Sequence, residues 1–80
     1  MERRQRVVAA RAERRRRDEF LNELGDLRRE VAALGDRVAT DYLAHALACF
    51  VKRKDEAGAV WLRLAVERLG AERTWQVPAT

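Results

Sequence analysis

The chain has 80 residues, a net charge of +4 and one cysteine. This length provides one small domain, and the single Cys49 excludes an internal disulfide and favours the reducing cytoplasm. No apolar run approaches the roughly 20 residues of a membrane-spanning helix, because His45 interrupts the longest run, Leu43 to Val51. We therefore expect a small cytoplasmic domain from a bacterium or phage, the source being indicated by the excess of arginine over lysine.

The positive charge is concentrated at the N-terminus. Glu2 and Glu13 are the only acidic residues among the first 17, so this stretch carries six net positive charges, whereas residues 18–80 are slightly acidic. The basic residues are Arg3, Arg4, Arg6, Arg11, Arg14, Arg15, Arg16 and Arg17. Such an uneven distribution is typical of nucleic-acid-binding proteins.

The first predicted helix covers about residues 3–34. Its apolar stripe, at helical spacings of three and four, consists of Phe20, Leu24, Leu27, Val31 and Leu34. Continued toward the N-terminus, the stripe meets Arg17, Glu13 and Arg6, which excludes a long coiled coil. Residues 1–19 are therefore a basic arm, helical or partly disordered. Gly25 leaves two alternatives, one long helix or a turn at which Asp26 caps a short helix, and we favour the long helix.

Two further helices follow. Gly35 predicts a helix end and Asp36 the N-cap of a helix over about 37–52; likewise, Asp55 predicts the N-cap of a helix over about 56–69, ended by Gly70. The expected inward residues are Val38 or Ala39, Tyr42, Leu43, Ala46, Leu47, Phe50 and Val51, then Val60, Trp61, Leu64, Ala65 and Leu69. The fold class is thus all-α, a small three-helix bundle with a long Arg-rich N-terminal helix. The helical domain spans residues 20–77, with Trp75 folded over the core edge, and 78–80 form a tail.

Catalysis is not expected. One histidine and one cysteine exclude a histidine cluster or a zinc knuckle, and the isolated glycines exclude a phosphate-binding loop. His45 and Cys49 are four residues apart, the spacing of a Cys–His pair, but the surrounding alanines favour helix packing over a cleft. We predict a protein that is not an enzyme and has no metal, cofactor or small-molecule substrate.

The run Arg14 to Arg17 is the most specific functional signal. Four consecutive helical residues span roughly 300° of the circumference at 100° per residue, so these arginines cannot all face a core. Their guanidinium groups can bind phosphate in a bidentate manner. The alternative is a solvated charge run stabilised by pairs such as Glu13 with Arg17. A second basic cluster, Lys52, Arg53 and Lys54, is either helix-terminal charge or a phosphate contact beside a turn at Gly58.

One stretch resembles a known family. The segment Arg53-Lys54, followed after three residues by Gly58-Ala59-Val60-Trp61-Leu62-Arg63-Leu64, is similar to a basic, glycine-containing apolar segment of the RNA-binding domain of the phosphorylated adaptor for RNA export. The resemblance covers about residues 27–65 and includes the helix end at Gly35. It implies a small helical bundle that binds RNA, with Arg53, Lys54 and Gly58 on the RNA-facing edge. Glu56-Ala57 replaces the threonine-proline of that family.

These observations predict a non-enzymatic protein that binds RNA, or with lower preference DNA, through phosphate contacts of the arm and of Lys52, Arg53 and Lys54. The alternative is a small regulatory protein-interaction module, either a homodimer or a binder of a partner's helix. We expect no membrane binding, because the arm lacks the apolar face that interfacial helices use.

Overall fold

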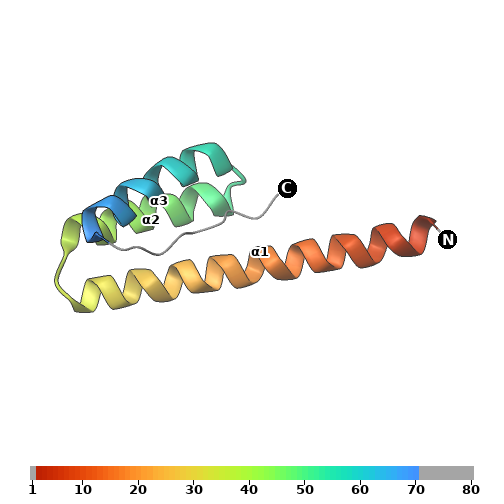
Figure 1. Cartoon of the computed structure of the whole chain (residues 1–80), viewed down its shortest axis with the longest axis horizontal. Helices are drawn as coiled ribbons and strands as arrows, with labels where there is room; N and C mark the ends of the chain where they lie inside the picture. Colours follow the sequence, from red (N-terminus) through yellow and green to blue (C-terminus); the bar gives the residue numbers. More distant parts are fainter. Residues whose placement is uncertain (1, 71–80) are drawn as a thin grey trace.

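A computed structural model of the chain describes residues 2–70, with side chains from residue 9 onward. It contains three helices, α1 (Glu2–Ala33), α2 (Arg37–Val51) and α3 (Asp55–Leu69). Helices α2 and α3 form an antiparallel pair against the C-terminal half of α1, and the N-terminal half of α1 extends beyond them (Figure 1). The all-α three-helix prediction is confirmed. The molecule is elongated, at 51 × 22 × 21 Å, because α1 alone accounts for roughly 48 Å at 1.5 Å per residue.

Helix α1 is continuous through Gly25, as expected. Helix α1 therefore contains both the basic arm, from Glu2 onward, and the first part of the helical domain. The predicted role of Trp75 lies outside the described residues.

The corner between α1 and α2 forms as its sequence predicts. Gly35 has a left-handed φ of +82°, which closes α1. Asp36 caps α2, since its Oδ1 accepts a hydrogen bond of 3.1 Å from the Ala39 N–H. Its backbone carbonyl accepts a 2.6 Å hydrogen bond from Thr40 Oγ1. The side-chain cap satisfies one of the free amides of the first turn.

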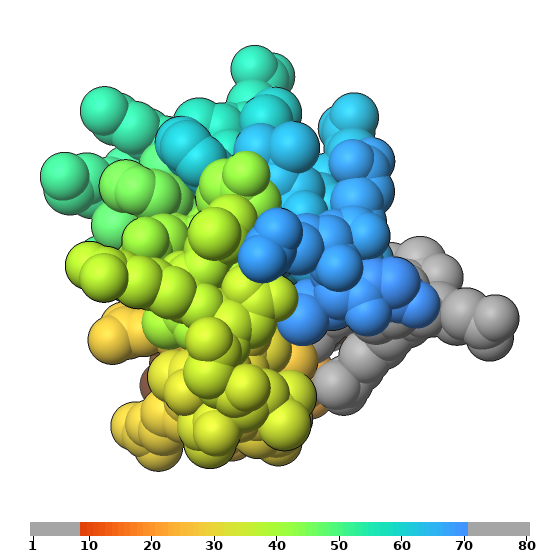
Figure 2. All heavy atoms as spheres, turned by 90° about the vertical axis from the view of Figure 1, so that its left-hand side faces the viewer, coloured from red at the N-terminus to blue at the C-terminus, as the bar shows by residue number. Residues whose placement is uncertain are grey.

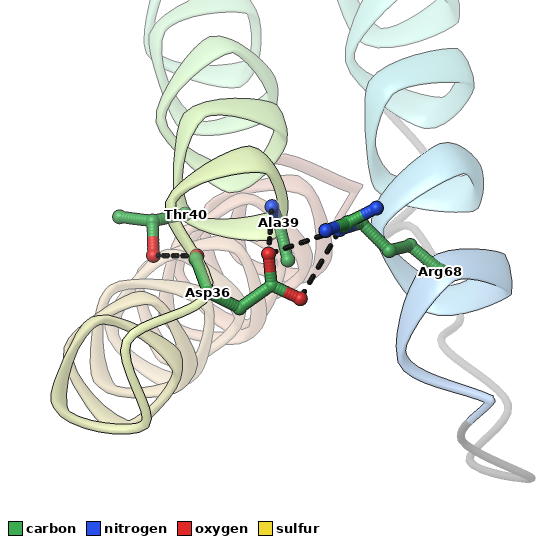
Figure 3. A network of polar contacts seen from close by, with 4 residues as sticks. All are labelled: Asp36, Ala39, Thr40 and Arg68. Carbon is green, nitrogen blue, oxygen red and sulfur yellow. Dashed lines mark hydrogen bonds and ion pairs between the residues drawn. The ribbon is translucent and has the colours of Figure 1, made fainter.

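The same carboxylate also joins α2 to α3. Arg68 Nε donates to Oδ1 and Oδ2 of Asp36 at 2.9 and 3.1 Å (Figure 3). The start of α2 and the end of α3 consequently lie side by side (Figure 2). The Ala39 amide, followed by the Arg68 guanidinium, lowers the pKa of Asp36, because both favour the charged carboxylate.

The core is built by all three helices. Its buried side chains are Phe20, Leu24 and Val31 of α1, Ala39, Leu43, Ala46 and Phe50 of α2, and Leu62 and Ala65 of α3. Phe20 meets Phe50 edge to face, with ring centroids 5.0 Å apart. The predicted stripe of α1 is confirmed except at Leu34, which is 80% exposed at the end of the helix.

The inward face of α3 differs from the expectation. Val60 and Leu64 are exposed, whereas Leu62 and Gly58 are buried. A Cβ atom built on Gly58 would lie 2.9 Å from the Phe50 ring. Because only a glycine permits this approach, α3 turns its Gly58 side toward α2. Val51 of α2 is exposed as well, so its predicted burial is wrong, whereas of the alternatives Val38 and Ala39 it is Ala39 that is buried.

Candidate nucleic-acid interface

The side chain of Arg17 connects α1 to the turn between α2 and α3. Arg17 is buried, and its Nη1 and Nη2 donate to Oδ2 and Oδ1 of Asp55 at 3.0 and 2.8 Å. Nη2 also donates to the Phe50 carbonyl at 2.7 Å. The hydrogen bonds from Arg17 lower the pKa of Asp55, and the same pairing raises the pKa of Arg17. This bidentate contact is the strong form of a charge-assisted hydrogen bond.

This contact overturns one alternative pairing and one predicted helix cap. Arg17 pairs with Asp55 and not with Glu13. Asp55 is the first residue of α3 and does not cap it; Lys54 occupies the N-cap position, and no side chain caps the helix there. The Asp55 carboxylate points to α1 because a buried guanidinium needs a compensating charge.

The exposed arginines of the basic arm lie next to the contact between Arg17 and Asp55. Arg11, Arg14, Arg15 and Arg16 are exposed, and at 1.5 Å per residue they lie within roughly 9 Å of Arg17 along the axis. Arg3, Arg4 and Arg6 belong to the first turns of α1, and their side chains are outside the description. The exposed arginines of the arm therefore lie directly N-terminal to the point where α1 contacts the turn between α2 and α3.

The second basic cluster forms the turn between α2 and α3. The Arg53 N–H donates to the Phe50 carbonyl at 3.1 Å, and the Lys54 N–H donates to the Cys49 carbonyl at 2.8 Å. This is the hydrogen-bond pattern of a Schellman motif, in which glycine usually occupies the left-handed position. Arg53 occupies it here, with φ of +61°. Lys52, Arg53 and Lys54 are all exposed.

The Phe50 carbonyl connects the two basic clusters. It accepts from Arg17 of α1 and from the Arg53 amide of the turn. Residues that are 36 positions apart are thus held at one end of the α2–α3 pair. An open hollow of about 520 Å³ lies against this turn, lined by Arg53, Lys54, Asp55, Glu56 and Ala57.

Two of the predicted contact residues serve packing. The guanidinium of Arg17 is engaged by Asp55 and Phe50. Gly58 lies inside α3, buried against Phe50, and not in a turn. The exposed candidates in the described part are accordingly Arg11, Arg14, Arg15, Arg16, Lys52, Arg53 and Lys54.

His45 lies at the exposed edge between α2 and α3. The His45 imidazole stacks on Trp61 at a centroid distance of 4.6 Å, and Cys49 is partly buried. Within the described residues, no group of three or more His, Cys, Asp or Glu side chains is arranged to hold a metal ion. None of the described helices is long and apolar enough to cross a membrane.

Comparison with known proteins finds no matching family model, curated protein or solved structure. The resemblance over residues 27–65 stays a prediction. In the structure this region comprises the end of α1, all of α2 and most of α3.

Proposed function

We propose that this chain is a non-enzymatic nucleic-acid-binding protein that holds the phosphate backbone with its basic arm and with the turn between α2 and α3. The observation that carries the proposal is the junction at Arg17, which joins α1, next to its exposed arginines, to the turn that contains Lys52, Arg53 and Lys54. Two clusters of one sign in a single region attract a polyanion more strongly than either one alone.

Binding would gain free energy from counterion release. Each phosphate that a lysine or arginine neutralises frees condensed cations, so affinity falls as the salt concentration rises. The junction contributes a fixed geometry, because Asp55 neutralises Arg17 internally and leaves the exposed arginines available for phosphate. We favour RNA over DNA on the resemblance of residues 27–65. Because the proposed contacts are all made to phosphate, which carries no sequence information, low sequence specificity is expected.

The test compares two triple variants with the same change in charge. The arm variant carries Arg14→Ala, Arg15→Ala and Arg16→Ala; the control carries Arg28→Ala, Arg37→Ala and Arg63→Ala, which are also exposed. Each is titrated with RNA and with duplex DNA at several salt concentrations. We expect the arm variant to lower the magnitude of the salt slope by about two to three, since each of the three lost phosphate contacts removes about 0.7 to 0.9. Equal slopes for both variants would contradict the proposal.

A protein-interaction module is the second candidate, and the exposed apolar residues of α3 favour it. Val60 is 52% and Leu64 37% exposed. The stripe of α1, in contrast, is occupied by the chain's own α2 at Phe20, Leu24 and Val31. Pulldown before and after nuclease digestion separates the two candidates, because a protein partner survives digestion. Sedimentation tests the homodimer.

A further inference from the structure

An aromatic group lies where α2 and α3 meet the solvent. The Trp61 ring is 4.6 Å from the His45 ring at an interplanar angle of 26°, and 5.8 Å from the Tyr42 ring at 38°. His45 is exposed, whereas Tyr42 and Trp61 are half-buried. Trp61 and Tyr42 pack at the edge of the core. Because His45 is exposed, its imidazole extends the aromatic group toward the solvent.

Two lysines are in register with this group. Lys52 is seven residues after His45, and Lys54 is seven residues before Trp61. Seven residues are almost two helical turns, so each lysine lies on the same side of its helix as the ring, about 10 Å along the axis. Each seven-residue span stays helical up to its lysine: the Lys52 N–H donates to the Ala48 carbonyl, and the Gly58 N–H donates to the Lys54 carbonyl. Both lysines therefore lie at the turn end of the α2–α3 pair, about 10 Å along the helix axes from the stacked rings.

We propose that His45 and Trp61 form a stacking site for an unpaired base of single-stranded nucleic acid, whose neighbouring phosphates contact Lys52 and Lys54. The inference rests on the proposed function and names its substrate class as single-stranded. Every base has a π-face, so stacking on an aromatic platform adds affinity without sequence preference. A duplex hides these faces in its own stack, and its bases cannot reach the imidazole.

Charge and exposure favour a nucleic acid here over a purely structural role. Packing of α2 on α3 is already provided by buried contacts such as Phe50 against Gly58, and an exposed imidazole adds little to it. An exposed imidazole stacked on a tryptophan, with two lysines at the nearby turn, also fits single-strand binders, which combine stacking rings with positive charge.

The experiment uses two single strands of equal length and equal phosphate number, an oligouridylate and an abasic strand. For the wild type we expect roughly tenfold tighter binding of the strand with bases. His45→Ala should remove most of this preference, and His45→Phe should keep it because phenylalanine restores a stacking face. Val51→Ala is the matched control, since Val51 is an exposed side chain elsewhere on α2. Circular dichroism checks that each variant is folded.

The outcomes separate this inference from the proposed function. If the wild type binds both strands equally, phosphate binding stands and the stacking site is refuted. If neither strand binds, both proposals fail, and the aromatic face becomes a candidate protein surface. A preference that His45→Ala leaves unchanged would also refute the assignment.

Discussion

Removing the charge of Asp55 tests the junction on which the fold and the proposed interface depend. Asp55→Asn keeps the size of the side chain but leaves the Arg17 guanidinium without its counter-charge. Breaking a fully buried pair costs about 3–5 kcal/mol. Here the side chains of Arg17 and Asp55 are 11% and 22% exposed, so water offsets part of the loss, and we expect the free energy of unfolding to fall by about 2 kcal/mol.

This loss is large for a domain of 80 residues. At roughly 0.05–0.15 kcal/mol per residue, the whole chain is stable by about 4–12 kcal/mol. A loss of 2 kcal/mol lowers the midpoint of thermal unfolding by roughly 10 °C. The assay is thermal and urea denaturation followed by circular dichroism. Asp41→Asn, an exposed carboxylate on α2, is the control and should leave the midpoint almost unchanged.

The effect should depend on pH in a defined direction. Arg17 holds the pKa of Asp55 below its usual value, which is about 4 in an unfolded chain. The stabilisation is therefore fully present above about pH 4 and is lost as the pH falls through the lower folded pKa. The difference between wild type and Asp55→Asn should shrink on acidification. An unchanged midpoint at neutral pH, or a difference that persists in acid, would refute the reasoning.

Three further predictions concern single residues. Gly58→Ala should destabilise the fold by about 1–3 kcal/mol, because the new methyl group meets the Phe50 ring; an unchanged urea midpoint would contradict the close packing. Arg53→Gly should raise the unfolding free energy by up to about 1 kcal/mol, since it relieves a left-handed arginine, while it weakens RNA binding measured by titration. Gly25→Ala should stabilise α1 by about 1 kcal/mol, because its Cβ would meet no neighbour, and binding should not change.

Much of the architecture can be derived from the sequence. The apolar stripe around Leu24, the stop at Gly35 and the cap at Asp36 all appear in the structure as predicted. These features depend on neighbours within three or four residues, so local spacing and backbone preference are sufficient to determine them. The basic arm is likewise a property of composition, because its charge is present in any fold.

The tertiary structure determines how each helix is rotated about its axis and which residues far apart in the sequence come into contact. Arg17 and Asp55 are 38 residues apart, and Asp36 and Arg68 are 32 apart. Such pairs depend on how α2 and α3 pack in the folded chain, and the close approach of Gly58 to Phe50 sets the rotation of α3 about its axis. The same rotation exposes Val60 and stacks the Trp61 ring against the His45 ring. Periodicity alone could not predict this, because helical spacing marks a possible face but not the partner that buries it.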